Sequence, residues 1–308
     1  MPRQYLDINP TFSPSRHGLL SALSDAITTP DDPHWTAGVT YEVLCPAGGT
    51  TYDECLVVSG TGQAPVPPPP TKSDTGGGLV RRGATAFTVY AQVDCSAPGF
   101  WDSAPQVVRD SLARVEGRQV EAALWTGTAA NAQVVFPRLA ADAEVVDADS
   151  GALMQPQAID VTGDGGALDV VRGVGALESA LAGCYDGVGV IHVPVDLYPA
   201  LAEAGLLVRD GSRYRTPLGS LVVIGPGYPG TAPDGSAPAA GTTYAYATGA
   251  LTVLRGEPTL MPRSSTLDRA TNTVHGIAER TYLVTWDCPC LLAVNVSLSR
   301  CCAGGEQP

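Results

Sequence analysis

The four histidines, His17, His34, His192 and His275, are the side chains best suited to acid–base chemistry at neutral pH. None stands beside an evident nucleophile or carboxylate partner, and no Gly-x-Ser-x-Gly segment places a serine on a nucleophile elbow. His192 falls in an apolar, strand-like run, which favours a buried, hydrogen-bonded histidine over a general base. We therefore expect no catalytic residues.

Lys72 is the only lysine of the chain, and its surroundings exclude a phosphate-binding loop. Such a loop requires a lysine directly after a Gly-x-x-x-x-Gly segment. Lys72 instead follows four successive prolines and a threonine. We expect no nucleotide and no other cofactor.

Cysteines near the C-terminal end offer the best candidate ligands for a metal. Cys288, Cys290, Cys301 and Cys302 carry the four thiolates that a structural zinc ion takes. Their spacing is not that of a zinc finger, and only the first two would share one face of a strand. The acidic stretch 160–169 lacks the spacing and the final glutamate of a calcium loop. We expect no metal, and we interpret the cysteines as small apolar core residues.

Composition and charge narrow the class of protein. The chain has 308 residues, of which 44% are hydrophobic and 16% charged, with 35 glycines and 26 prolines. This is too apolar for disorder and too rich in turn residues for a helical bundle, so we expect one large or two closely joined domains with β-structure. The net charge is −13, and the densest basic pair is Arg81-Arg82, which excludes a basic nucleic-acid patch. An acidic wall that tolerates DNA without specific contacts remains compatible.

Signals for export and for membrane insertion are missing from the sequence. Met1–Pro10 lacks the apolar core of a signal peptide, and runs such as Leu291–Val294 are too short to span a bilayer. The eight cysteines are scattered and do not form a dense disulfide framework. We therefore expect a protein that is made in a cytoplasm and works without a membrane.

The first third of the chain predicts an irregular arm, several strands and a long loop. Residues 1–37 are broken by prolines, with a helix-compatible stretch at 18–27. Alternating apolar residues predict strands within 38–58 and at 85–95. Between them, 59–78 contains four successive prolines and three successive glycines, which favour the extended tip of a loop.

The clearest helix is expected at 103–126. Ser103 is a suitable N-cap, Pro105 falls in the first turn, and Gly127 follows the last turn. Such a helix extends for roughly 35 Å, which is long for a compact domain. We expect its charged residues, Glu121 included, on exposed faces.

The remaining pattern predicts a mixed α/β block and closing strands, without an internal repeat. The expected helices are 168–184 and 196–204. The expected strands are 189–193, one at Tyr214, 221–224, 244–254, 278–287 and 291–298, the last two meeting at Cys288-Pro289-Cys290.

Four local segments carry a resemblance to a known family. They are 87–95 (FTVYAQVDC), 121–127 (EAALWTG), 189–194 (GVIHVP) and 279–286 (ERTYLVTW). These segments look like parts of actinobacterial-phage capsid subunits. The order of arm, long loop, long helix, mixed block and closing strands also resembles the major capsid proteins of tailed bacteriophages with the Hong Kong 97-type fold. The resemblance covers most of the chain and implies an α+β fold.

The resemblance implies a division of the chain into named parts. These are an N-arm at 1–37, an extended-loop region at 38–95, a peripheral domain at 96–160 and 255–308 with a spine helix at 103–126, and an axial domain at 165–254.

It also implies a structural role without enzyme activity. The subunit would assemble through pentamers and hexamers into the icosahedral head that encloses the double-stranded DNA of a tailed phage. Its partners would be further copies of itself, separate scaffolding, portal and decoration proteins, and packaged DNA contacted without sequence specificity. The implied location is the virion, after assembly in the cytoplasm of a bacterial host.

Two departures from the family pattern concern processing. Many members begin with a charged helical segment that a protease removes, and no such segment follows Met1, so we expect a separate scaffolding protein or none. Some members crosslink a loop lysine to an asparagine of another subunit. Lys72 lies in the expected loop tip, with Asn272 and Asn295 as candidate acceptors. A lysine that only solubilises the loop is the interpretation we favour.

Two alternatives stay open. A nanocompartment shell similar to encapsulins would share the architecture and enclose an enzyme instead of DNA. A hydrolase or carbohydrate-binding α/β protein would need a site that the motifs above do not show.

Overall fold

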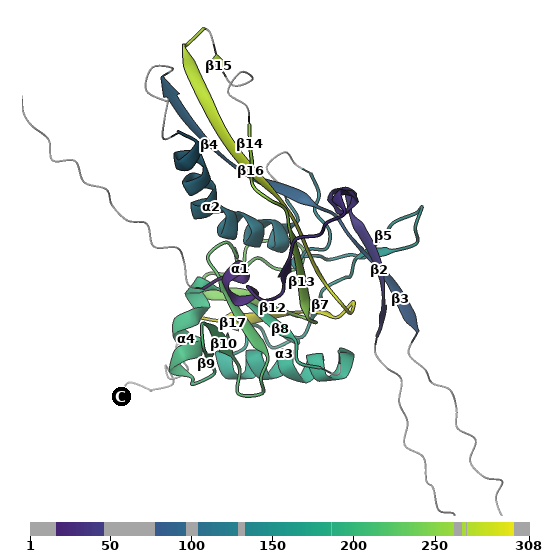
Figure 1. Ribbon diagram of the computed structural model, residues 1–308. Coiled ribbons are helices and arrows are strands. Elements are labelled where there is room, and N and C mark those ends of the chain that lie inside the picture. Colours follow the sequence, from purple (N-terminus) through teal and green to yellow (C-terminus); the bar gives the residue numbers. More distant parts are fainter. Residues whose placement is uncertain are drawn as a thin grey trace, which may run out of the picture.

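Three sheets and one long helix organise the chain in the computed structural model (Figure 1). The structure describes residues 17–45, 78–96, 104–128, 133–185, 187–261, 267–268 and 270–298. All counts of elements below refer to these ranges. The α+β class is confirmed.

The first sheet is built on the longest strand, β16. Four strands pair with it directly, and β1 joins the far side of β13. Strand β4 pairs with β16 over ten antiparallel positions, from Phe87 opposite Tyr282 to Ser96 opposite Thr273. The strands of this sheet are β1 (Ile27–Thr28), β4 (Phe87–Ser96), β13 (Leu251–Arg255), β14 (Thr259–Leu260), β15 (Leu267–Asp268) and β16 (Thr273–Trp286).

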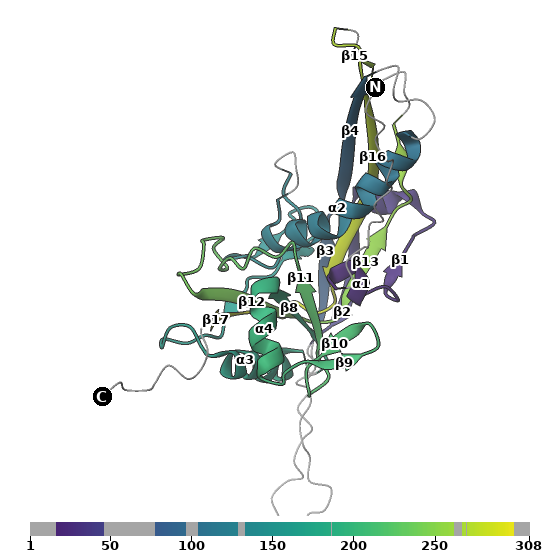
Figure 2. The same cartoon turned by 90° about the vertical axis from the view of Figure 1, so that its left-hand side faces the viewer.

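Helix α2 (Ala104–Thr126) lies along this sheet, and Figures 1 and 2 show β4 and β16 extending with it away from the rest of the molecule. Its residues Val108, Leu112 and Trp125 are buried in the main core, together with Phe87 and Val89 of β4. A helix with one apolar stripe is stabilised by this packing more than by its own propensity.

The second sheet is a mixed one with the order β7-β17-β12-β8-β11-β10-β9. Its central strands β8 and β11 are parallel and buried at every position, as continuous apolar runs in parallel strands require. The strands are β7 (Ile159–Asp160), β8 (Val190–Pro194), β9 (Val208–Asp210), β10 (Arg213–Arg215), β11 (Leu221–Gly225), β12 (Thr242–Thr248) and β17 (Leu291–Ser297).

Helices cover one face of the second sheet. Helix α3 (Val170–Cys184) begins at Asp169, whose carboxylate accepts hydrogen bonds from two backbone amides of the first turn at 3.0 Å. Its buried residues Val174, Leu177 and Leu181 belong to the same core cluster as Val294 of β17. Helix α4 (Tyr198–Glu203) follows a short 3-10 turn after β8.

The third sheet is small and joins distant segments. Strands β2 (Val39–Leu44) and β3 (Leu79–Ala84) pair antiparallel in register, and β6 (Leu153–Gln155) and β5 (Val145–Val146) extend the sheet. Strands β2 and β3 flank residues 46–77, so the proline-rich run and Lys72 lie outside the described residues.

Several local expectations need correction. The stretch 18–27 forms only a four-residue helix, α1 (Leu19–Ala22), and Ile27 begins β1. The strand expected at 244–254 is two strands, since β12 ends at Thr248 and β13 begins at Leu251 in another sheet. The helix expected at 103–126 is present as α2, yet Glu121 is only 1% exposed and not on a solvated face.

The two-stranded ribbon of β13 with β16 continues as the ribbon of β12 with β17. Leu251 pairs with Trp286 in the first sheet, and Thr248 pairs with Leu291 in the second. The two connecting segments therefore pass from one sheet to the other side by side, and the Asp287 amide of one donates to the Ala250 carbonyl of the other at 3.2 Å. No helix in the described part of the chain is long and apolar enough to cross a membrane.

Two glycines give opposite expectations for substitution by alanine. A Cβ added at Gly117, inside α2, meets nothing within 4 Å. Gly117→Ala should therefore raise the free energy of unfolding by ~0.5–1 kcal/mol, through helix propensity and reduced freedom of the unfolded chain. Gly227→Ala should lower it, because the new Cβ would overlap the Arg118 carbonyl. Urea denaturation of both variants measures this, and a destabilised Gly117→Ala would contradict it.

Candidate functional site

His192 is a buried structural residue, as its apolar surroundings predict. Its side chain has no exposed surface, Nδ1 lies 3.0 Å from the Tyr228 hydroxyl, and Nε2 lies 3.1 Å from Thr248 Oγ1. Burial lowers its pKa to about 3, so the imidazole stays neutral at physiological pH. His17 lies at the junction of arm and second sheet, with Nδ1 3.1 Å from the Ile224 carbonyl oxygen.

The expectation that no histidine has a carboxylate partner is wrong for the other two. His34 Nδ1 lies 2.6 Å from Asp32 Oδ1, and His275 Nδ1 lies 2.7 Å from Asp94 Oδ1. Hydrogen bonds from the His34 backbone and side chain lower the pKa of Asp32, and the His275 side chain lowers that of Asp94. The first pair lies within one surface turn, and the second joins the neighbouring strands β4 and β16. A nucleophile next to such a pair would be needed for covalent catalysis.

The residues considered for a crosslink are not assembled into a site in the described part of the chain. Lys72 lies outside it. Asn272 is exposed in the turn before β16, with a φ of 53°. Asn295 pairs with Tyr244 within the second sheet, and its amide oxygen is buried there without a hydrogen-bond partner. The assignment of Lys72 to an inter-subunit contact remains a prediction.

The interpretation of the cysteines as unconnected core residues is wrong for four of them. Cys45 is joined to Cys288, and Cys184 to Cys290, by disulfides with Cα–Cα distances of 5.6 and 5.8 Å. Within the described residues no cluster of three or more metal-ligating side chains occurs. Cys301 and Cys302 lie outside these residues.

Glu121 of α2 forms a junction between three parts of the chain. Its carboxylate accepts hydrogen bonds from the backbone amides of Leu19 in α1 and Gly227 in the loop after β11, both at 2.8 Å. Burial raises the pKa of Glu121 to about 7, although both amide donors act to lower it. The one carboxylate thus holds the arm, the long helix and the second sheet together.

Aromatic side chains reinforce this junction at the end of α2. The Trp125 ring packs against Tyr228 and Tyr246, with centroid distances of 5.0 and 4.8 Å. Its Nε1 donates to Thr231 Oγ1 at 2.9 Å, and the Tyr246 hydroxyl donates to the Thr231 carbonyl at 2.9 Å. Each buried ring therefore has its polar atom satisfied, as rings with a polar end require.

We expect the stability of the protein to depend on the ionisation of Glu121. The folded protein holds this proton more tightly than the unfolded chain, whose glutamate has a pKa near 4.5. The contribution to stability is therefore full below that value and is lost as the pH rises through about 7. Raising the pH from ~5 to ~8 should increase the stability of Glu121→Gln relative to the wild type by roughly 2–3 kcal/mol.

Urea denaturation at several pH values measures this difference, whatever the absolute stability of the variant. Glu144→Gln, which changes an exposed glutamate, serves as the control and should show a flat difference. A flat profile for Glu121→Gln would contradict the junction described above.

Strands β2 and β3, which flank the segment 46–77, are held against the end of β16. The Tyr41 hydroxyl lies 2.5 Å from Thr285 Oγ1 and donates to the Trp286 carbonyl at 2.7 Å. The Arg82 guanidinium lies 5.5 Å from the centroid of the Trp286 ring. Arg82 has no exposed surface, and all three of its side-chain nitrogens lack a hydrogen-bond partner. Burial lowers its pKa, since an unpaired buried charge is unfavourable.

Two arginines that differ in their partners should respond oppositely to removal of the charge: Arg82 is fully buried, and the Arg280 side chain is 18% exposed. Arg82→Met should raise the free energy of unfolding by about 1–3 kcal/mol, because no hydrogen bond or ion pair is lost. Arg280→Met should lower it by about 2 kcal/mol, because Arg280 donates to Glu116 Oε2 at 2.8 Å, which Tyr282 also binds at 2.7 Å. Thermal and urea unfolding of both variants compare the two. Destabilisation by Arg82→Met would show that the guanidinium has a partner.

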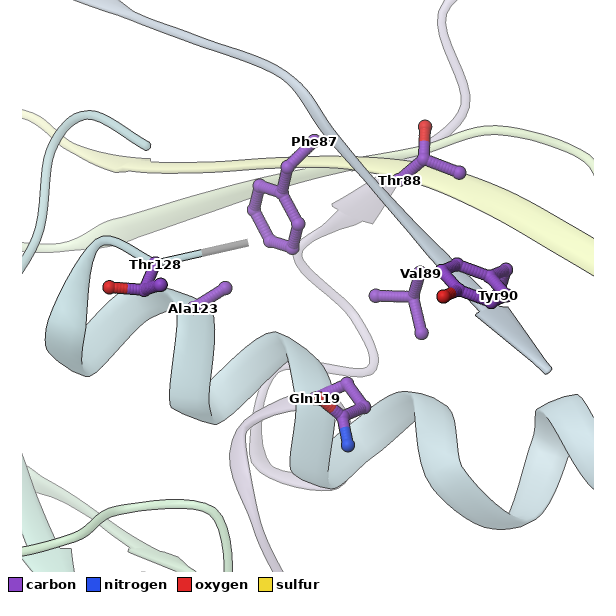
Figure 3. Close-up of a pocket in the computed structure, with 7 residues that line it drawn as sticks. All are labelled: Phe87, Thr88, Val89, Tyr90, Gln119, Ala123 and Thr128. Atoms are coloured by element: carbon purple, nitrogen blue, oxygen red, sulfur yellow. The ribbon is translucent and has the colours of Figure 1, made fainter. Parts of the chain in front are cut away.

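A small pocket lies between α2 and β4 (Figure 3). Phe87 and Val89 point from the strand toward Gln119 and Ala123 of the helix. The volume is about 250 Å³, below the ~300–1,000 Å³ typical of ligand pockets. Tyr90 is the one titratable side chain among its seven lining residues, so the pocket offers no acid–base pair.

No family model and no curated protein matches the sequence. Solved structures nevertheless match over nearly the whole chain. The capsid of an empty GTA particle is 15% identical, with 96% of this chain and 95% of that chain covered and a TM-score of 0.53. The capsid of Ralstonia phage GP4 is 8% identical, with coverages of 97% and 96% and a TM-score of 0.52.

A structure from Microbacterium phage Oxtober96 is 16% identical, with 96% of each chain covered and a TM-score of 0.51. At such identities, likeness establishes the fold alone. The chain has the Hong Kong 97-type capsid fold that the order of its elements predicts.

Proposed function

We propose that the chain is the major capsid protein of a tailed phage and not an enzyme. The observation that carries this proposal is the end-to-end match with capsid structures, in which 95–97% of both chains is covered. A shared domain embedded in a different protein would leave part of one chain unmatched. The subunit's activity is then assembly into an icosahedral shell around double-stranded DNA.

We infer the division into domains from the sheets, with changes to the expected bounds. The second sheet would form the axial domain, and the sheet of β4 and β16 with α2 would form the peripheral domain, although 87–95 was expected in the extended-loop region. Strand β17 pairs with the second sheet and β13 with the first. The expected boundary at 254/255 had assigned β13 to the axial domain and β17 to the peripheral domain, which is the reverse. On this division the axial sheet would include β17, which lies far along the sequence from the other strands of that sheet.

Assembly would use repeated contacts between copies. Axial domains meeting head to tail around five-fold and six-fold axes close into pentamers and hexamers. The stability of a shell is the combined effect of many such interfaces, each of modest binding free energy. The net charge of −13 favours an inner wall that contacts packaged DNA without binding its sequence. Any scaffolding, portal and decoration proteins would be separate chains, the shell would form in the host cytoplasm, and the virion would be its final location.

A nanocompartment shell remains the alternative with the same architecture. The nucleic-acid content of purified particles separates the two, because a phage head holds DNA and a nanocompartment holds a protein cargo. A hydrolase or carbohydrate-binding protein finds no support in the pocket between α2 and β4, which offers no acid–base pair.

Electron microscopy of the purified protein tests the proposal directly. We expect rings or hollow isometric shells at high protein concentration. Val208 and Leu218, at one end of the second sheet, are 48% and 76% exposed in the single subunit. The double substitution Val208→Asp with Leu218→Asp should abolish the shells, because it puts charge into an interface, while the melting temperature of the subunit stays within a few degrees.

Uniform monomers of the wild type at high concentration would contradict every shell function. Shells formed equally well by the double variant would leave the shell function intact and place the axial contacts elsewhere.

A further inference from the structure

The segment Cys288-Pro289-Cys290 connects three distant parts of the subunit. It lies between β16 and β17, where the chain passes from the first sheet to the second. Cys288 is joined to Cys45, directly after β2, and Cys290 to Cys184, the last residue of α3. The two bridges span 243 and 106 residues of sequence. Each therefore closes a long loop, the case in which a crosslink restricts the unfolded chain most.

Hydrogen bonds hold the same three parts in place without the bridges. The Tyr185 hydroxyl, next to Cys184, donates to Asp287 Oδ2 at 2.6 Å, and the Cys288 amide donates to Asp287 Oδ1 at 2.8 Å. The Ala250 amide donates to the Tyr185 hydroxyl at 3.2 Å. On the β2 side, Tyr41 binds Thr285 and Trp286. The fold thus brings the thiols together before any bridge is needed.

The bridges and the proposed place of synthesis are in conflict. Disulfides persist in oxidising surroundings and are rare in a cytoplasm, where thiols are kept reduced. Cys45, Cys288 and Cys290 are buried, with at most 6% exposed surface. Burial slows exchange with soluble thiols, so bridges that form late also persist.

We propose that these four cysteines are thiols during assembly and form the two bridges after the particle leaves the host. In each bridge one S–S bond forms and two S–H bonds break. Two electrons and two protons pass to dissolved dioxygen, which becomes hydrogen peroxide. The proposal rests on the proposed function for its timing. The result is a late covalent crosslink that stabilises the subunit. In it Cys45, directly before 46–77, is bonded to Cys288 of the same subunit.

Mapping of the cysteines tests the timing. Cells expressing the chain, and particles purified in air, are quenched in acid and alkylated with N-ethylmaleimide, and their peptides are analysed by mass spectrometry. We expect alkylated cysteines in the cells and linked peptides in the particles. Because Cys288 and Cys290 share one peptide, Cys288→Ala and Cys290→Ala assign each bridge. Bridges already complete in the cells would overturn the proposal.

Free thiols in aerated particles, or stoichiometric zinc found there by elemental analysis, would overturn it equally. The mapping reads the chain itself, so it decides the proposal even if microscopy shows no shells. In that event the proposed function fails and the bridges are judged on the soluble protein.

Thermal unfolding tests the consequence for stability. Protein kept in reductant should melt at least roughly 5 °C below the air-oxidised protein. The double variant Cys45→Ala with Cys288→Ala should lose much of that difference, whereas Cys95→Ser, in β4, should keep it. Equal melting temperatures of the oxidised and reduced wild type would show that the bridges lock nothing.

Discussion

The pairing of β16 with its neighbours is the constraint on which the other parts of the subunit depend. Along its length β16 pairs with β4, β13, β14 and β15. Arg280 and Tyr282 bind Glu116 and so fix α2 to the strand. At its end, Thr285 and Trp286 bind the hydroxyl of Tyr41 in β2, the strand that precedes 46–77. One strand thereby sets the positions of the long helix, the loop root and the crossing to the second sheet.

Two buried ionisable groups lie at the points where segments meet. Glu121 is satisfied by two backbone amides, which makes its carboxylate a specific connector of the arm and the second sheet to α2. Arg82 has no such hydrogen bonds and contacts the face of Trp286. A satisfied buried group specifies one arrangement, whereas an unsatisfied one is unfavourable unless other contacts compensate. Hydrogen bonds to the buried side chain therefore stabilise the junction at Glu121, whereas the junction at Arg82 is stabilised by the contact with the Trp286 ring and by neighbouring groups.

Local signals allowed much of the fold to be predicted. Helix α2 has an N-cap, an early proline and a terminal glycine in sequence, and Phe87, Val89 and Ala91 alternate as in a strand with one buried face. The burial of Glu121 could not be predicted, because its partners are 102 and 106 residues away. The disulfides escaped prediction for the same reason. Nor does the pattern of 244–254 show that Gly249 separates strands of two sheets, since apolar alternation is the same on both sides.

The shared crossing of β12–β13 and β16–β17 has a mechanical consequence. The segments Gly249-Ala250 and 287–290 lie side by side and connect the first sheet to the second. The strands on either side of them are paired with each other in both sheets. A force that pulls the sheets apart is carried by two backbones in parallel, so neither strand can be peeled from its partner at this point. Rotation of one sheet against the other is opposed as well, because Glu121 of α2 binds Gly227 and Asp287 binds Tyr185. The ribbon therefore transmits tension from one sheet to the other without loss of strand pairing.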